Sequence, residues 1–264
     1  MDLLIKGKVA LVGASGNGLG LAAACRLAME GCHVAVCDLH TPALEAAKAA
    51  VLAAGQGAAR VMARNVDLTK PGDIETLVAD VQQELGSIDI LVTNAGGPPP
   101  GMFDQATDDK WKKGFELTFL SAVRLIRAVL PDMKARKWGR IINFTSRALR
   151  EPIDNLMISN AVRLAVGGMA KTLATEVAPF GITVNNVCPG PTSTDRAIEL
   201  AAARAVKKGI STGEELAQTA KRIPRGRLAR PEEPAAAVAF LSSELAGHIT
   251  GISLLIDGGE TKGI

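Results

Sequence analysis

Short runs of consecutive apolar residues alternate along the chain with longer segments whose apolar positions recur about every 3.6 residues. The short runs are typical of strands buried on both faces, as in a parallel sheet, and the longer segments are typical of helices. The expected strands are Val9–Val12, His33–Cys37, Arg60–Arg64, Ile88–Val92, Arg140–Phe144, Thr183–Val187 and Ser253–Ile256. The expected helices include Leu21–Met29, Ala43–Ala54, Ile74–Leu85, Phe115–Leu130 and Val162–Val177.

Strand and helix patterns alternate from end to end without a linker or a break in composition. This order predicts an α/β fold in three layers, a doubly wound, seven-stranded parallel sheet with helices on both faces. We therefore expect a single domain over residues 1–264. The segment at about residues 190–226 is long, polar and helical only in patches, which predicts a helical excursion or lid. Its basic residues are more typical of solvated surface than of an anion site: Arg204, Lys207, Lys208 and Arg222.

Composition and charge narrow the classes of function. The chain has 264 residues, a net charge of +3 and no basic face with interleaved aromatic residues, so we expect no nucleic-acid partner. No apolar run approaches the roughly 18 residues needed to span a bilayer, and no signal peptide is visible. The four cysteines form no CxxC pair, which fits reduced thiols, and we predict no metal site. These features predict a cytoplasmic protein with no membrane partner.

A glycine-rich segment joins the first expected strand to the first expected helix. It spans residues 13–20 and reads GASGNGLG. Glycines in such a turn let the backbone approach a pyrophosphate, and the helix N-terminus supplies unpaired N–H groups and a partial positive charge. The segment therefore predicts a dinucleotide site, although the same glycines could serve only to make a tight turn.

An acidic residue at the end of the second expected strand bears on the choice of cofactor. Asp38 can accept hydrogen bonds from an adenosine ribose diol and would repel a 2′-phosphate. Its neighbour Leu39 brings no compensating positive charge, although His40 is close. The sequence therefore favours NAD(H) over NADP(H). A further loop, GGPPPG at Gly96–Gly101, follows the fourth expected strand, at the sheet edge where open α/β sheets bind ligands.

Motifs spread over essentially the whole chain resemble the short-chain dehydrogenase/reductase family, and within it the members similar to 3-oxoacyl-acyl-carrier-protein reductases. The matching segments are KVALV at 8–12, NVDL at 65–68, TNAG at 93–96, NFTS at 143–146, PFGITVN at 179–185, Pro189-Gly190, Thr194-Asp195, ITG at 249–251 and DGG at 257–259. The resemblance implies a Rossmann-type fold and hydride transfer between a nicotinamide cofactor and a carbonyl or alcohol substrate. The cofactor-binding residues that it implies are Gly13, Ser15, Asn17, Gly18, Leu19, Gly20, Asp38, Asp67, Leu68, Asn94, Ala95, Gly96, Arg163, Pro189, Gly190, Thr192 and Thr194.

The chain departs from the family at the positions that carry the chemistry. The resemblance places Ser146 at the catalytic serine, but Thr118, Ser159 and Arg163 stand where the family has asparagine, tyrosine and lysine. Ser159 and Arg163 keep the i, i+4 spacing that puts two side chains on one helical face, and the chain holds no tyrosine. Ala14 replaces the first glycine of the family's loop pattern.

These substitutions change the acid–base chemistry that the site can perform. A phenol, with a pKa of about 10, is a usable proton donor, whereas a serine hydroxyl is far weaker and an arginine stays protonated. Arg163 can still stabilise a developing alkoxide, and loss of a general acid lowers a rate by about 10²–10⁴. Arg147 and Arg150 follow Ser146 and fit either a solvated loop or recognition of an acidic substrate.

Two functions therefore remain open. One is an NAD(H)-dependent oxidoreductase with atypical catalytic residues that acts on a small-molecule carbonyl or alcohol. The other is a catalytically impaired dinucleotide-binding or scaffolding protein. The resemblance also implies a homotetramer, or a homodimer, with which the alanine-rich face near Ala161–Ala170 and the apolar segment Ile252–Ile256 are compatible.

Overall fold

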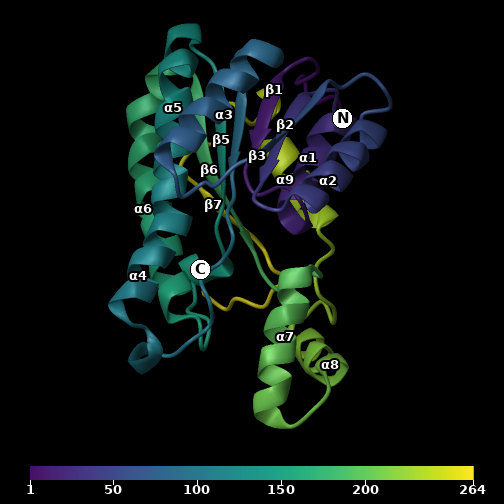
Figure 1. The fold of residues 1–264 in the computed structure, drawn as a ribbon, viewed down its shortest axis with the longest axis vertical. Coiled ribbons are helices and arrows are strands. Elements are labelled where there is room, and N and C mark those ends of the chain that lie inside the picture. The colour runs from purple at the N-terminus through teal and green to yellow at the C-terminus, as the bar shows by residue number, and fades with distance from the viewer. Residues whose placement is uncertain (264) are drawn as a thin grey trace.

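The computed structural model describes residues 1–263, which form one sheet of seven parallel strands (Figure 1). The strands are β1 (Val9–Val12), β2 (His33–Asp38), β3 (Val61–Asn65), β4 (Ile90–Thr93), β5 (Gly139–Phe144), β6 (Ile182–Pro189) and β7 (Ser253–Ile256). Their order across the sheet is β3-β2-β1-β4-β5-β6-β7, which confirms the predicted doubly wound α/β architecture. Each predicted strand is present, with ends displaced by no more than two residues.

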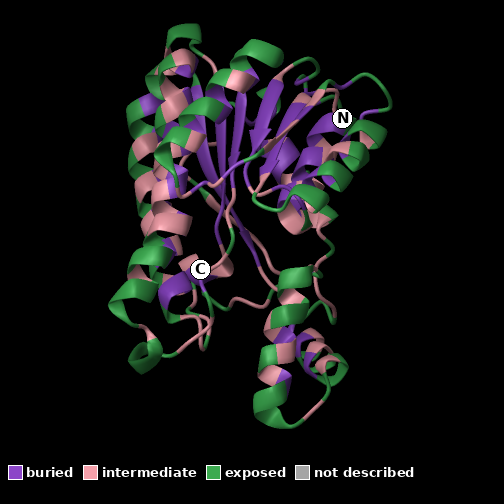
Figure 2. Ribbon diagram, in the orientation of Figure 1, coloured by how far each residue is buried: buried purple, intermediate pink, exposed green. Residues whose placement is uncertain are grey.

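Apolar side chains cover both faces of the sheet, which is why its strands are continuous apolar runs in the sequence. Along β1, Val9 and Leu11 pack into one core, whereas Ala10 and Val12 pack into the other. Figure 2 shows the buried strands enclosed by helices whose outer faces are exposed. One face is covered by α3 (Pro71–Glu84), α5 (Ser121–Arg136) and α6 (Met157–Val177), and the other by α1 (Gly18–Met29), α2 (Thr41–Ala54) and α9 (Glu232–Leu241).

The direction in which the chain crosses the sheet reverses next to β1. β1 pairs with β2 on one side and with β4 on the other, so successive crossovers run first outward to β3 and then back toward β7. The loops that leave β1 and β4 therefore separate and open a crevice at the carboxyl ends of the strands. This is the position at which open α/β sheets bind ligands.

The segment predicted as one helix over Phe115–Leu130 is built differently. The structure has α4 (Asp108–Phe115), a π-helical turn over Glu116–Leu120, and then α5. A π turn takes an extra residue and shifts the faces of the helix that follows, so a single 3.6-residue period cannot describe the whole segment. The turn buries Thr118, one of the predicted site residues. The structure also contains α9, which the apolar pattern of the sequence did not predict.

Residues 195–222 form the predicted excursion as two helices, α7 (Asp195–Lys208) and α8 (Thr212–Arg222). Figure 1 shows them projecting from the sheet, beyond the carboxyl ends of the strands. The fully buried carboxylate of Glu215 joins them, since it accepts from Arg204 Nε at 2.7 Å and Lys208 Nζ at 2.6 Å. Lys208 is exposed, as predicted, and Arg204 is partly exposed, and both cations are in addition paired with a buried carboxylate of α8.

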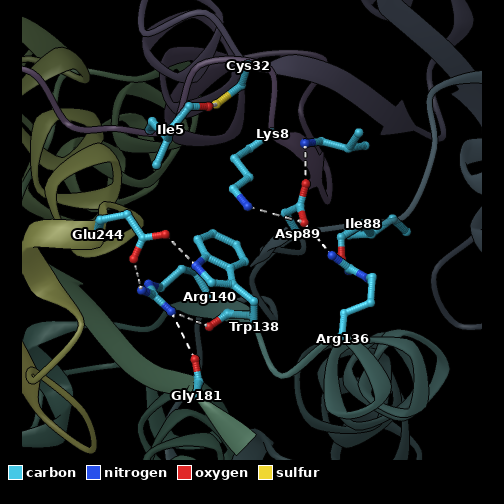
Figure 3. Close-up of polar contacts among 12 residues, drawn as sticks. Ile5, Lys8, Cys32, Ile88, Asp89, Arg136, Trp138, Arg140, Gly181 and Glu244 are labelled. Atoms are coloured by element: carbon cyan, nitrogen blue, oxygen red, sulfur yellow. Dashed lines mark hydrogen bonds and ion pairs between the residues drawn. The ribbon is translucent and has the colours of Figure 1, made fainter.

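The amino ends of the strands carry a connected set of ion pairs and hydrogen bonds (Figure 3). Asp89 accepts from the Val9 backbone N–H at 2.9 Å and from Arg136 Nη1 at 2.6 Å. The side chain of Arg140 donates to the backbone oxygens of Gly139, Gly181 and Ser243, and it pairs with Glu244 at 3.3 Å. This network ties β1, β4, β5 and β6 together at the edge opposite the crevice.

Candidate active site

A cavity of about 670 Å³ follows the carboxyl ends of the strands, between the sheet and the α7–α8 excursion. Side chains from both halves of the chain line it. Of the predicted site residues, the lining contains Asn17, Gly18, Leu19, Asp38, Asp67, Leu68, Asn94, Ala95, Gly96, Ser146, Ser159, Arg163, Pro189, Gly190, Thr192 and Thr194. The structure thus brings most of the predicted residues together around one space.

Three of the predicted cofactor residues lie beneath the cavity rather than along it. Ser15 is fully buried, donates to Val12 O at 2.8 Å and accepts from the Cys37 N–H at 3.1 Å. A Cβ on Gly13 would lie 2.6 Å from Asn94 O, and one on Gly20 would lie 2.4 Å from Ala14 O. These residues shape the loop by close backbone contact, and their contact with a cofactor stays a prediction.

The loop itself suits a phosphate group. Asn17 precedes α1, and its side chain makes no capping hydrogen bond. The first N–H groups of α1 therefore stay open to the cavity, next to Gly18 and Leu19. Ala14, which replaces a glycine of the family pattern, adopts φ +42°, and its carbonyl accepts from Asn94 Nδ2 at 3.0 Å. The alanine thus takes a left-handed conformation that disfavours side chains with a Cβ.

Two acidic residues, Asp38 and Asp67, also line the cavity, and Asp38 lies against the glycine-rich loop. Asp38 Oδ2 accepts from the Gly16 N–H at 3.0 Å, and a Cβ on Gly16 would lie only 2.8 Å from that oxygen. Asp67 accepts from the N–H and hydroxyl of Thr69 at 2.9 and 2.6 Å. These two hydrogen bonds hold the pKa of the Asp67 carboxyl below its usual range. Both acids are fixed by the backbone around them, so they present defined acceptors to the cavity.

Ser146, Ser159 and Arg163 meet where β5 ends against α6. Arg163 Nε donates to Ser159 Oγ at 3.2 Å, one helical turn earlier, as the i, i+4 spacing predicts. Arg163 Nη1 donates to the carbonyls of Thr145 and Phe144 at 2.9 and 3.3 Å. Ser146 Oγ accepts from the Ala148 N–H at 3.1 Å. Both serine oxygens therefore accept from the protein, which leaves their own protons free for a group in the cavity.

The charge on Arg163 has no acidic partner among residues 1–263, since its hydrogen bonds go to a hydroxyl and two carbonyls. Burial, and then the like charge of Arg196, lower the pKa of Arg163 to about 10. A cation placed in this way can attract an anion or stabilise negative charge that develops during a reaction.

Thr118 lies behind Arg163 and does not line the main cavity. Its buried hydroxyl has no hydrogen-bond partner among residues 1–263. It faces a separate cavity of about 10 Å³ whose other lining residues include Asn94, Ser121 and Arg163. Thr118 therefore does not contact the main cavity, and its predicted catalytic role stays a prediction.

The loop that follows β6 also lines the cavity, with the predicted residues Pro189, Gly190, Thr192 and Thr194. Thr192 Oγ1 donates to Gly190 O at 3.0 Å, and Thr194 caps α7 by accepting from the Ala197 N–H at 3.3 Å. A Cβ on Gly190 would lie 2.7 Å from the Cβ of Asp257, so a glycine is needed where β6 leaves the sheet.

Arg196 and Glu260 are among the charged lining residues of the cavity that were not predicted. Glu260 pairs with Arg147 at 3.0 Å, with side chains only 10% and 13% exposed, and burial raises the pKa of the Glu260 carboxyl. Arg147 is thus neutralised rather than solvated, and Arg150 is exposed outside the cavity lining. The only sequence signal for these residues was their place directly after the TD and DGG motifs.

Over residues 1–263, the four cysteines are free thiols, and no group of three or more His, Cys, Asp or Glu side chains is placed to hold a metal. No helix within the same residues has the length and apolar character needed to cross a bilayer.

Comparison with known proteins gives a consistent result. The family described as enoyl-(acyl carrier protein) reductase matches residues 13–261. The D-beta-hydroxybutyrate dehydrogenase of Cupriavidus necator is 34% identical over 257 residues, which cover 97% of this chain and 98% of that protein. The 3-oxoacyl-(acyl-carrier-protein) reductase of Haemophilus influenzae is 34% identical over 255 residues, with 97% and 98% covered.

Solved structures agree with these sequence matches. The L-sorbose reductase of Gluconobacter frateurii, solved with NADPH and L-sorbose, superposes with a TM-score of 0.94 at 35% identity, with 100% of both chains covered. An NAD⁺-bound xylitol dehydrogenase superposes with a TM-score of 0.90 at 28% identity, covering 97% of this chain and 100% of that one. These neighbours bind nicotinamide dinucleotides of both kinds. The chain therefore belongs to the short-chain dehydrogenase/reductase family of oxidoreductases.

Proposed function

We propose that this protein binds NAD(H) and transfers a hydride between the nicotinamide and the carbonyl or alcohol carbon of a small molecule. The observation that carries the proposal is the placement of Ser146, Ser159 and Arg163 in the same cavity as the glycine-rich loop. The cavity also offers what a dinucleotide needs: an open helix N-terminus at one point and the Asp38 carboxylate at another.

The bound cofactor would supply the hydride, and this chain's residues would position the carbonyl and stabilise its charge. The hydroxyls of Ser146 and Ser159 can each donate to the substrate oxygen, because their own oxygens already accept from the protein. The hydrogen bond from Arg163 polarises the Ser159 hydroxyl and makes it a stronger donor. The positive charge of Arg163 stabilises the alkoxide that develops when hydride reaches the carbon.

Neither the serines nor Arg163 is a strong donor of the proton that completes the alcohol. A serine hydroxyl is a weak acid, and the guanidinium of Arg163 stays protonated at neutral pH even with its lowered pKa of about 10. The proton therefore comes from water or from a group on the substrate. We expect turnover slower than that of a phenol-assisted site by about 10²–10⁴.

The preference for NAD(H) rests on the surroundings of Asp38. Its carboxylate lies in the cavity lining, where it can accept from a ribose diol but repels a 2′-phosphate. His40 offers little compensation, because its Nδ1 accepts from the Ala43 N–H and so serves as the cap of α2. Leu39 is exposed and uncharged.

Calorimetric titration of NADH and NADPH under identical salt tests the cofactor proposal. We expect NADH to bind at least about tenfold more tightly, a difference of about 1.4 kcal/mol. Asp38→Ser should narrow this difference in affinity, whereas Asp109→Ser, at an exposed position in the first turn of α4, should leave it unchanged. Equal affinities, or tighter NADPH binding, would overturn the preference.

Turnover of NADH with a panel of ketones and aldehydes tests the reaction. We expect slow oxidation of NADH that Ser146→Ala reduces to background without loss of NADH binding. Cofactor binding without turnover on any substrate would count against hydride transfer.

A non-catalytic, dinucleotide-binding role is the second candidate. It is favoured by the absence of tyrosine from the chain and by the left-handed Ala14 in the phosphate loop. The triple variant Thr118→Asn/Ser159→Tyr/Arg163→Lys separates the two roles. A large gain in activity would show that the pocket still accepts a substrate. No gain, in a variant that binds NADH, would favour the scaffold.

We also propose that the protein forms a homotetramer, or a homodimer, through α6 and β7. Leu164 on α6 is 50% exposed, and β7 is an edge strand preceded by the partly exposed Ile252. Light scattering during size-exclusion chromatography distinguishes these states from a monomer, and a monomer would refute both.

A further inference from the structure

Two arginines from distant parts of the chain approach the same point of the cavity. A Cβ placed on Gly97 would lie 3.8 Å from Arg163 Nη2 and 3.9 Å from Arg196 Nη2. Arg163 projects from α6, whereas Arg196 lies in the first turn of α7. Both side chains belong to the cavity lining, so the two guanidinium groups face one space beside the glycine loop after β4.

This arrangement is electrostatically unfavourable while the space holds no anion. Each charge repels the other, and Arg196 is one of the causes that lower the pKa of Arg163. Among residues 1–263 no carboxylate pairs with Arg163. Arg196 donates to Pro98 O at 3.0 Å and pairs with Glu199 at 3.3 Å, but that pair is well exposed, with 43% and 66% of the side chains accessible. An exposed pair of this kind contributes little, so Arg196 is free to turn to a better partner.

Two other arginines that line the cavity have largely buried acidic partners, whereas Arg222 is exposed to solvent. Arg147 pairs with Glu260, and Arg204 pairs with Glu215 on α8. The convergence of Arg163 and Arg196 therefore stands out as charge that the described protein does not neutralise. Paired guanidinium groups bind carboxylate and phosphate oxygens through short, charge-assisted hydrogen bonds of about 2.7–2.9 Å.

We propose that Arg163 and Arg196 together bind a carboxylate on the substrate, so that the protein acts on a short oxo acid or hydroxy acid. The proposal rests on the hydride-transfer function and names its substrate class. Arg163 donates to Ser159, which would hold the carbonyl oxygen, so neighbouring side chains would hold the carbonyl and the carboxylate. We therefore expect only a few carbons between these two groups of the substrate.

The same two guanidinium groups could instead meet a phosphate of the cofactor. The phosphates have their own place at the open N-terminus of α1, beside Gly18, whose Cβ would lie 3.5 Å from Thr194. We therefore assign the arginine pair to the substrate, and the test separates the two sources of anion.

The experiment compares oxo acids with their uncharged esters. Calorimetry measures the binding of 2-, 3- and 4-oxopentanoate and of their methyl esters to protein saturated with NADH. We expect at least one acid to bind at least about tenfold more tightly than its ester. Arg196→Gln should abolish the difference, whereas Lys207→Gln, which removes a fully solvated charge from the same helix, should preserve it. The affinity for NADH should change less than about twofold in Arg196→Gln.

Several results would overturn the assignment. The first is that no oxo acid binds more tightly than its ester, or that none binds at all. The second is that an acid still binds more tightly than its ester in Arg196→Gln. A loss of NADH affinity in that variant, with acid and ester unaffected, would assign the pair to the cofactor phosphates. NADH oxidation is measured in parallel. Acid preference without oxidation of NADH would refute hydride transfer but support the anion site. Oxidation of NADH by ketones without acid preference would support hydride transfer but refute the anion site.

Discussion

The amino and carboxyl ends of the strands differ in how far their buried polar and charged groups are paired. At the amino ends, Asp89 and Arg140 are each surrounded by complementary groups, as Figure 3 shows. At the carboxyl ends, Arg163 has no acidic partner and the buried Thr118 hydroxyl has no hydrogen-bond partner, within the described residues. The loop that leaves β1 even holds Ala14 at φ +42°.

This difference separates stability from function. A buried charge whose partners are all in place resists change, because removal of one member leaves the others unsatisfied. A charge or a strained backbone without such compensation persists only where the rest of the fold holds it, and such features concentrate at functional sites. We therefore expect substitutions at the amino ends to lower stability and those at the carboxyl ends to change binding and rate.

The largest effect is expected for Arg140→Met. The substitution leaves Glu244 and three backbone oxygens without the guanidinium, in a position where Arg140 is almost completely buried. We expect the free energy of unfolding to fall by about 3 kcal/mol in urea titrations. Arg127→Met, an exposed arginine on α5, is the control and should change it by less than about 0.5 kcal/mol. If Arg140→Met and Arg127→Met lowered the free energy of unfolding equally, the network at the amino ends of the strands would not be a source of stability.

Arg163→Met should show the opposite balance. The rate of NADH oxidation should fall about 100-fold, because the alkoxide loses its positive neighbour. The free energy of unfolding should fall by less than about 1 kcal/mol, because loss of two carbonyl hydrogen bonds is offset by relief of an unpaired, desolvated charge. The two measurements are made on the same preparation. A loss of stability as large as that of Arg140→Met would show that Arg163 is structural.

The sequence predicted the sheet well because parallel strands buried on both faces are continuous apolar runs, as in Ala10 and Leu11 of β1. Helix α9 was not identified, since its run of alanine, valine, phenylalanine and leucine has little amphipathic contrast. The π turn at Thr118 could not be predicted from the spacing of apolar residues either, because one inserted residue shifts the helical period without leaving a compositional signal.

The site was predictable where its residues belong to one local motif. The glycine loop, Asp38 and the Ser159–Arg163 spacing are of this kind, and the structure places Asp38, Ser159 and Arg163 along the cavity. Arg196 and Glu260 come to the cavity through tertiary folding, from α7 and from the C-terminal segment. No local pattern indicates that Arg196 lies beside Arg163, so only the structure reveals the convergence.

A smaller effect is expected from Ala14→Gly. The left-handed conformation that Ala14 adopts penalises a Cβ, and glycine removes the penalty. We expect the free energy of unfolding to rise by about 0.5–1 kcal/mol, the reverse of the usual effect of glycine. Ala49→Gly, at an exposed position in the interior of α2, is the matched control and should lower it by about 1 kcal/mol. A destabilising Ala14→Gly would mean that the loop is not strained.

The smallest effect concerns Glu260, whose largely buried carboxylate pairs with Arg147 at the carboxyl ends of the strands. Burial raises the pKa of its carboxyl despite the attraction of Arg147. The folded state therefore binds a proton more readily than the unfolded state, whose glutamate pKa is about 4.3. The contribution of Glu260 to stability is then greatest below that value and declines as the pH rises through the raised pKa.

The variant Glu260→Gln removes this titration. We expect the free energy of unfolding of the native protein, relative to Glu260→Gln, to decline by less than about 1 kcal/mol between about pH 4 and pH 7. Urea titrations at matched ionic strength measure it. An increase over the same range would show that Arg147 outweighs burial, and the carboxyl edge would then contain a pair as well compensated as those of the amino edge.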